Sequence, residues 1–337
     1  MIDNTSNFEI PVVLFMFKRY EKLLLIIDKL KIIKPKKIYL LSDGPRYQEE
    51  EKDIIMCREK ILEYIDWDCT VIKRFPESNI GVFENIGLGA KWVFEKEEMA
   101  IFLEDDNLPE ITFFKYCEEL LYYYKNENKI LWICGTNYLK DSSNEIDSSY
   151  FFTQNMMPCG WASWSNKFNL YYDGYLENYN NDTKKNISVR YLDKSLMRQD
   201  IRNWDMEKHR IISCKRPNSW DYQMSFTLRY YDLLGIVPVF NQIKNIGVDQ
   251  YSIHGGVSLD NVMLRRFCYL ETREMKFPLT HPSEIEINLF LEKKLNNIIK
   301  FPLSYRIKGR LNRLLKFMFG IDFYTPFLEG LKSKWKN

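Results

Sequence analysis

Three adjacent carboxylates, Glu104, Asp105 and Asp106, directly follow a short apolar run at residues 99–103. Adjacent carboxylates repel one another, so a clustered set is unfavourable unless a cation neutralises it. Mg²⁺ and Mn²⁺ prefer oxygen ligands, and Mg²⁺ typically takes one or two carboxylates together with substrate phosphates. The tripeptide therefore suits a site for a divalent metal and a diphosphate. A solvated acidic turn that ends the strand is the alternative interpretation.

The elements that must position these carboxylates follow from hydrophobic periodicity. Apolar runs at residues 11–17, 37–41, 68–73 and 99–103 have strand length, and the segments between them, such as Tyr20–Ile33, have helical spacing. This alternation predicts an α/β fold with a mostly parallel central sheet flanked by helices. Ligands of such sheets bind beyond the carboxyl ends of the strands. Three of these ends carry Lys18-Arg19, Ser42-Asp43-Gly44 and the acidic tripeptide.

The second half of the chain is less regular. We expect a helix over residues 109–125 and strands over 129–134 and 236–240. With no internal repeat or low-complexity linker, the chain is interpreted as one catalytic domain, residues 1–275, followed by a basic helical appendage, residues 276–337. Within the domain, the nucleotide-binding part is expected over residues 10–106 and the acceptor part over 107–275.

Composition excludes several classes of protein. The chain has 337 residues, of which 45% are apolar, so a disordered or collagen-like chain is excluded. Its net charge of +2 lacks the long-range field of a dedicated nucleic-acid binder, and no nucleic-acid partner is expected. The charge is unevenly distributed along the chain. From Lys300 onward there are nine basic and two acidic residues, a net charge of +7, and the preceding residues carry −5.

The basic tail is also amphipathic. Basic and apolar residues alternate at helical spacing: Arg310, Leu311, Arg313, Leu314, Leu315, Lys316 and Met318. Such a segment can lie in an anionic membrane interface, which would suit an enzyme with a lipid-linked acceptor. A helix that packs on the catalytic domain and keeps its lysines solvated is the alternative.

The cysteine pattern, the N-terminal residues and the length of the apolar runs indicate where the protein is located in the cell. The seven cysteines are an odd number without paired CxxC spacing, which argues against a disulfide framework or a zinc site. Residues 1–9 lack the features of a secretory signal, and no run approaches 18 apolar residues. We expect a cytoplasmic protein, with peripheral contact to the inner face of the membrane as an option for the tail.

The order of the motifs resembles a known family. Residues 101–114 resemble the metal-binding signature of GT-A glycosyltransferases, in which an acidic motif follows a core strand. Residues 11–19, Ser42-Asp43-Gly44, the acidic motif, Pro158-Cys-Gly-Trp161 and Trp220-Asp221 resemble, in this order, landmarks of the inverting N-acetylglucosaminyltransferase that begins complex N-glycan branching. The chain is also similar to bacterial hemolytic-protein-A-like transferases of surface-polysaccharide clusters.

The resemblance implies roles for the residues that bind the donor. Arg19 and Asp43 would hold the nucleotide, since a guanidinium pairs with diphosphate and a carboxylate accepts from a uracil N–H. Within the acidic motif, Glu104 would contact the transferred sugar, Asp105 the ribose and Asp106 the metal, Mn²⁺ or Mg²⁺. Surface and turn roles for Arg19 and Asp43 remain as alternatives.

Three further residues follow from the same resemblance. Asp221 would be the catalytic base, a role compatible with its place in the first turn of a helix that Ser219 caps. Trp161 would be a platform for the sugar, unless its indole belongs to the core. His254, in the glycine-containing segment 245–256, would contact the diphosphate or metal in a mobile loop, unless it is structural.

The resemblance thus implies a metal-dependent inverting glycosyltransferase. It would move a sugar from a nucleotide diphosphate donor, with uridine diphosphate favoured, to a hydroxyl of a glycan or lipid-linked acceptor in surface-polysaccharide synthesis. A sugar nucleotidyltransferase is the enzymatic alternative, but residues 17–21 after the first strand contain no glycine, whereas those enzymes carry a glycine-rich loop there. A non-catalytic carbohydrate-binding protein of the same fold is the other alternative.

Overall fold

The computed structural model describes residues 8–249 and 260–334, and its centre is an eight-stranded sheet. The strands lie in the order β3-β2-β1-β4-β8-β6-β9-β7, and a separate two-stranded sheet pairs β10 with β5. The strands are β1 Val12–Met16, β2 Lys37–Ser42, β3 Thr70–Arg74, β4 Met99–Glu104, β5 Asn107–Pro109, β6 Ile130–Cys134, β7 Tyr150–Thr153, β8 Trp161–Trp164, β9 Leu234–Pro238 and β10 Ile243–Asn245.

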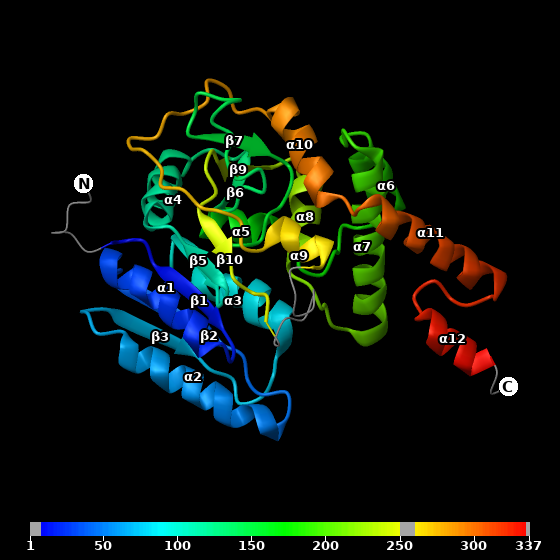
Figure 1. Cartoon of the computed structure of the whole chain (residues 1–337), viewed down its shortest axis with the longest axis horizontal. Helices are drawn as coiled ribbons and strands as arrows, with labels where there is room; N and C mark the ends of the chain where they lie inside the picture. Colours follow the sequence, from blue (N-terminus) through cyan, green and yellow to red (C-terminus); the bar gives the residue numbers. More distant parts are fainter. Residues whose placement is uncertain (1–7, 250–259, 335–337) are drawn as a thin grey trace.

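Helices flank the sheet, and the last helices extend to one end of the molecule (Figure 1). The helices are α1 Tyr20–Ile33, η1 Gln48–Glu50, α2 Glu51–Tyr64, η2 Phe83–Gly87, α3 Leu88–Phe94, α4 Ile111–Tyr123, α5 Ser165–Tyr171, α6 Asn181–Ser188, α7 Lys194–Cys214, α8 Asp221–Tyr230, α9 Val262–Phe267, α10 Leu289–Ile299, α11 Leu303–Met318 and α12 Phe327–Lys334.

The predicted fold class is confirmed. Strands β3, β2, β1 and β4 pair in parallel, as the alternation of strands and helices predicts. Strand β8 runs antiparallel between β4 and β6, β6 and β9 are parallel, and β7 is antiparallel to β9. The sequence pattern missed β7 and β8, because both are four-residue strands in which every residue is buried, so neither shows alternation.

The alternation of side chains along β1 divides the core between the two faces of the sheet. Val12 and Leu14 belong to a cluster that includes buried residues of α1, α2 and α4. Val13 and Phe15 belong to a second cluster, with residues of η2, α3, α5, α8 and α10. All residues of β1 are therefore buried, and only its carboxyl end offers polar groups to a ligand.

The C-terminal segment divides into two parts. The expected appendage, residues 276–337, includes helix α10, but this helix packs into the body, because Leu291 and Leu295 are fully buried in the second core cluster. Helix α11, in contrast, has no buried residue. Across residues 8–249 and 260–334, no helix is both long and apolar enough to span a bilayer.

The indole of Trp161 lies at the centre of the second cluster, with 1% of its surface exposed. Its ring is stacked between Phe102 and Trp132, with centroid distances of 3.9 and 4.2 Å. A ring enclosed on both faces cannot offer a face to a sugar. The structure therefore corrects the expectation of a sugar platform and supports the alternative, a core indole.

We predict that Trp161→Ala lowers the free energy of unfolding by about 3–5 kcal/mol, since it removes a fully buried aromatic ring and leaves a cavity. Trp161→Phe keeps a ring in the stack and also removes an indole N–H that has no acceptor within the described residues, so its loss should stay below about 1.5 kcal/mol. Urea unfolding measures both. Similar losses for the two variants would contradict the stacked-core interpretation.

Candidate active site

The carboxyl ends of β1, β2 and β4 meet at one edge of the sheet. Met16 is in register with Ser42, and Phe15 with Glu104, so the residues that follow these strands are neighbours in space. Arg19, at the start of α1, and Asp43, after β2, are thereby brought beside the acidic motif. The parallel pairing thus assembles the polar strand ends that the sequence placed far apart.

The two-stranded sheet brings a later segment to the same place. Asn107 of β5 is in register with Asn245 of β10, and the Ile246 amide donates to the Asp106 carbonyl at 2.8 Å. Gly247 then lies so close that a Cβ on it would be 2.2 Å from Asp106 Oδ2. Any larger residue at this position would require the Asp106 carboxylate to move. The predicted functional segment 245–256 therefore begins at the acidic motif, and His254 lies outside the described residues.

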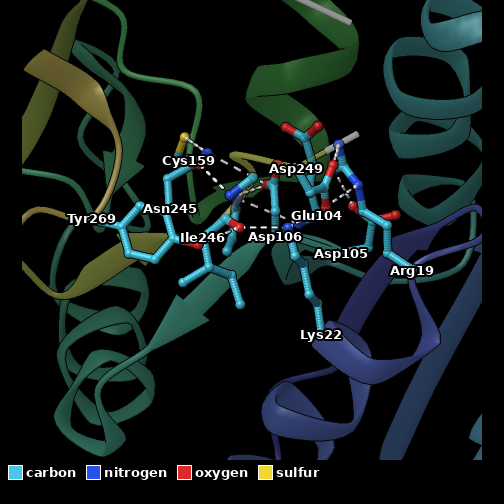
Figure 2. Close-up of polar contacts among 12 residues, drawn as sticks. Arg19, Lys22, Glu104, Asp105, Asp106, Cys159, Asn245, Ile246, Asp249 and Tyr269 are labelled. Carbon is cyan, nitrogen blue, oxygen red and sulfur yellow. Dashed lines mark hydrogen bonds and ion pairs between the residues drawn. The ribbon is translucent and has the colours of Figure 1, made fainter. Parts of the chain in front are cut away.

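Two basic side chains connect the carboxylates of this edge (Figure 2). Arg19 Nη1 donates to Asp105 Oδ1 at 3.0 Å and to Asp106 Oδ2 at 3.1 Å, and Arg19 Nε pairs with Asp249 Oδ2 at 3.3 Å. Lys22 Nζ donates to the Ile246 carbonyl at 2.6 Å and also pairs with Asp249. Sequence reasoning found Arg19 but missed Lys22 and Asp249, because only their spatial proximity to Arg19 reveals them.

The acidic motif remains short of positive charge. Burial raises the pKa of Glu104 well above its ordinary value, and the charges of Asp106, Asp105 and Asp221 raise it further. Burial and the charge of Asp106 raise the pKa of Asp105 to about 6. Burial also raises the pKa of Asp106, although Arg19 and Lys22 oppose the shift. A further cation at this edge would stabilise the ionised carboxylates.

The residues of the acidic motif could supply only part of the ligand set of a divalent metal. Within residues 8–249 and 260–334, no three His, Cys, Asp or Glu side chains converge as ready ligands. Asp106 Oδ2 is engaged by Arg19, and Oδ1 accepts from Asn107 Nδ2 at 2.7 Å. A metal here would therefore take one or two carboxylates and draw its remaining ligands from phosphate and water, as Mg²⁺ does. Arg19 would have to release Asp106.

A pocket opens beside the acidic motif, between the strand ends and the segment that leads into η2. Its lining includes Phe17, Arg19, Arg46, Asn85 and Glu104. The Arg46 guanidinium lies over the Phe17 ring at 5.3 Å from its centroid. Within the described residues, no group donates a hydrogen bond to the Glu104 carboxylate. The pocket therefore combines an aromatic and cationic end with an acidic end.

Asp43 lines this pocket but is already committed to the scaffold. Its Oδ1 accepts from the amides of Gly44 and Ile80, both at 2.7 Å. Its Oδ2 accepts from Asn79 Nδ2 at 2.8 Å and from the Gly81 amide at 2.9 Å. Four donors occupy the lone pairs of both oxygens. The structure thus corrects the expectation that Asp43 accepts from a uracil N–H: it clamps the loop before η2.

Asn85 lines the same pocket as Asp43 and is not among the binding residues that sequence reasoning identified. It lies in the π-helical turn η2, has 6% of its surface exposed, and its buried Oδ1 has no hydrogen-bond donor within the described residues. Such turns are often found at functional sites, and an unpaired buried carbonyl is unfavourable without a ligand. The feature of the sequence that could have revealed Asn85 is its position as a polar residue within an apolar helical run.

Asp221, the expected catalytic base, lies near enough to the acidic motif for its charge to act on Glu104. It is the first residue of α8, and its Oδ1 accepts from Ser219 Oγ at 2.6 Å. Ser219 Oγ in turn accepts from the Tyr222 amide at 3.0 Å, while Trp220 is the N-cap residue. Because the charge of Asp221 contributes to the raised pKa of Glu104, the two carboxyl groups share one electrostatic environment.

Comparison with known proteins gives the following. No family model and no curated protein match the sequence. Among solved structures, the apo bifunctional glycosyltransferase WbbM is 12% identical, with a TM-score of 0.32. The match covers 68% of this chain and 38% of WbbM, so the chain spans well under half of that protein.

Two other structures resemble the chain to a similar degree. The mannosyltransferase PcManGT of Pyrobaculum calidifontis, solved with GDP-Man and Mn²⁺, is 10% identical, with a TM-score of 0.34 and coverage of 67% of this chain and 71% of that one. A UDP-glucose pyrophosphorylase complexed with UDP-glucose is 9% identical, with a TM-score of 0.35 and coverage of 70% and 93%. Likeness of this degree does not distinguish sugar transfer from nucleotidyl transfer.

Glu50 fixes the two basic side chains at the cationic end of the pocket, and its ionisation should make the stability of the protein depend on pH. It accepts from Lys18 Nζ at 2.7 Å and from Arg46, whose hydrogen bonds, together with that of Lys18, lower the pKa of Glu50 to about 2. Because the pKa is depressed on folding, the ionised group stabilises the protein above its unfolded pKa, and this contribution is lost as pH falls toward 2.

We therefore expect Glu50→Gln to lower the free energy of unfolding by about 1–3 kcal/mol near neutral pH, and the difference from wild type to shrink below about pH 4.5. Urea unfolding across this pH range measures it. Glu63→Gln, at a side chain that is 66% exposed, serves as the control. A difference for Glu50→Gln that does not depend on pH would contradict the assignment.

Proposed function

We propose that this chain is a glycosyltransferase that moves a sugar from a nucleotide diphosphate sugar to a hydroxyl of a glycan or lipid-linked acceptor. The observation that carries the proposal is the juxtaposition, at one sheet edge, of three features. They are a pocket with an Asn85 amide oxygen that accepts from no described residue, the charge-deficient motif of Glu104, Asp105 and Asp106, and Asp221, whose charge acts on Glu104.

The donor would lie along the edge with its base in the pocket. Asn85 Oδ1 can accept from a base N–H, and the Phe17 ring beside Arg46 offers an apolar face for stacking. Asp105 would accept from the ribose hydroxyls. Arg19 would exchange its carboxylate partners for the diphosphate, which a guanidinium binds well.

Asp106 would be the protein ligand of a Mn²⁺ or Mg²⁺ ion. Held there together with the diphosphate, such an ion would supply positive charge to the leaving group. It would also relieve the repulsion that raises the pKa of the neighbouring carboxyl groups. Glu104, which has no hydrogen-bond donor within the described residues, would accept from a hydroxyl of the transferred sugar.

Asp221 would act as the general base. Ser219 Oγ holds one carboxylate oxygen at 2.6 Å, which orients the group and leaves its other oxygen for the acceptor hydroxyl. As the proton passes to Asp221, the acceptor oxygen forms a bond to the anomeric carbon. The bond from that carbon to the diphosphate oxygen breaks, and its electron pair leaves with the diphosphate. Attack from the side opposite the leaving group inverts the anomeric centre.

A panel of nucleotide sugars with Mn²⁺ tests the donor site and the base together. A cognate donor at about 100 times its Kd should stabilise the folded chain by about 2.7 kcal/mol, which raises Tm by about 4 °C. Asp106→Asn should lose most of this shift. Asp221→Asn should keep it but lower the rate of transfer by at least about 100-fold.

Asp182→Asn is the matched control, because that side chain is 88% exposed on α6. It should retain both the Tm shift and the transfer rate. A retained anomeric configuration would contradict the role of Asp221. Formation of a nucleotide sugar and pyrophosphate from a nucleoside triphosphate and a sugar phosphate would replace sugar transfer by nucleotidyl transfer.

Asn85 yields a separate prediction. Asn85→Ala should weaken nucleotide binding by about tenfold or more, because the base N–H would lose its acceptor. The same change should not lower the free energy of unfolding of the unliganded chain, since the removed oxygen has no partner there. Calorimetric titration and urea unfolding measure the two effects. Asn312→Ala, at an exposed position, is the control. A nucleotide affinity of Asn85→Ala that is unchanged, or reduced only as much as that of Asn312→Ala, would contradict a base-binding role.

A further inference from the structure

Five arginines line one cavity between two helices, at the end of the molecule where α7 and α11 lie (Figure 1). Arg198 and Arg202 come from α7, and Arg306, Arg310 and Arg313 come from α11. Spacings of three and four residues place each set on a single face of its helix. The cavity has a volume of about 330 Å³ and lies apart from the candidate active site.

Carboxylates of the described residues leave the positive charge of this arginine pocket unbalanced. Within residues 8–249 and 260–334, none of the five arginines forms an ion pair with a carboxylate. Asp205 also lines the pocket, but its carboxylate accepts from Tyr179 at 2.9 Å and pairs with Lys184 at 2.5 Å. Like charges on two facing helices repel, so an anion between them would stabilise the arrangement.

The side chains converge on one place. A Cβ on Gly309 would lie 3.7 Å from both Arg202 Nη1 and Arg313 Nη1, so the two guanidinium groups flank the same point of α11. Burial and the charge of Arg313 lower the pKa of Arg202. Arg306 Nε is buried, and no described residue accepts its hydrogen bond. A buried donor without a protein acceptor is free to donate to an oxygen of a bound group.

Contacts at both ends hold the pocket in shape. At one end, Gln199 of α7 accepts from the Phe301 amide at 2.7 Å, and Lys300 pairs with Asp193 at 2.7 Å. At the other end, the rings of His209 and Tyr324 stack at a centroid distance of 3.6 Å. The segment that carries α11 is therefore fastened to α7 on either side of the five arginines.

We propose that the arginine pocket is a binding site for a phosphate or diphosphate group, separate from the candidate active site. Guanidinium groups bind phosphate oxygens through paired, charge-assisted hydrogen bonds, and several of them can share one such group. A doubly or triply charged anion would offset the net +4 of five arginines and Asp205 far better than a carboxylate. The proposal does not depend on the proposed sugar transfer.

The group can be carried by a soluble compound or by a lipid. Exposed apolar side chains recur along α11 beside the pocket: Leu303, Ile307, Leu311, Leu314 and Met318. A lipid headgroup in the pocket would bring these side chains to the membrane surface, whereas a soluble phosphate would not involve them. The two sources are separated by comparing pyrophosphate with vesicles.

The first arm is calorimetric titration of the full chain with inorganic pyrophosphate, in the presence of EDTA. We expect binding by wild type and at least about tenfold weaker binding by Arg202→Gln/Arg306→Gln. Lys308→Gln/Lys332→Gln removes the same net charge from exposed positions of α11 and α12 and should bind as wild type does. Because the pocket variant removes repelling charges, its Tm should not fall, which confirms that it is folded.

The second arm is flotation with phosphatidylcholine vesicles, with and without phosphatidic acid. Loss of phosphatidic acid-dependent flotation in the pocket variant alone would support the site and identify a lipid phosphate as its ligand. Pyrophosphate binding that the pocket variant loses, with unchanged flotation, would support the site for a soluble phosphate compound. Binding lost equally in both double variants, or lost only in Arg19→Gln, would overturn the proposal.

Discussion

The burial of three adjacent carboxylates at the end of β4 is the constraint on which the candidate site depends. Burial and then their mutual repulsion raise the pKa of Glu104 and Asp105, so the surrounding elements must supply positive charge. Arg19 and Lys22, on consecutive turns at the start of α1, supply part of it. The remaining deficit is the reason why we propose a metal and a diphosphate at this edge.

Other carboxylates near the pocket differ because the scaffold already satisfies them. Asp43 accepts four hydrogen bonds and fixes the loop before η2, and Glu50 fixes Arg46 and Lys18. Buried polar groups that are satisfied hold structure, whereas those left unpaired, such as Asn85 Oδ1, are available to a ligand. We therefore assign Asp43 and Glu50 to the scaffold of the pocket and propose Asn85 as a binding residue.

Charge is also distributed unevenly over the whole chain. The acidic motif lies in the body, while α11 carries arginines toward a cavity and apolar side chains toward solvent. Helix α10, which precedes it, is packed into the core, so the change from body to appendage falls between α10 and α11. The candidate active site thus lies in the packed body, whereas the proposed arginine pocket lies where α11, a helix without buried residues, meets that body.

Much of this could be predicted from the sequence, because buried parallel strands are continuous apolar runs and the polar residues at their ends stand out. The strands β1 to β4, helix α1 with its bounds Tyr20–Ile33, and the position of the acidic motif follow from local pattern. The tertiary structure decided which side chains are free. In the folded chain Trp161 is buried, and the Asp43 carboxylate has hydrogen-bond donors on both oxygens. Lys22 forms an ion pair with Asp249, and the arginines of α7 and α11 line the same pocket. These outcomes depend on contacts between residues far apart in the chain, which no local spacing encodes.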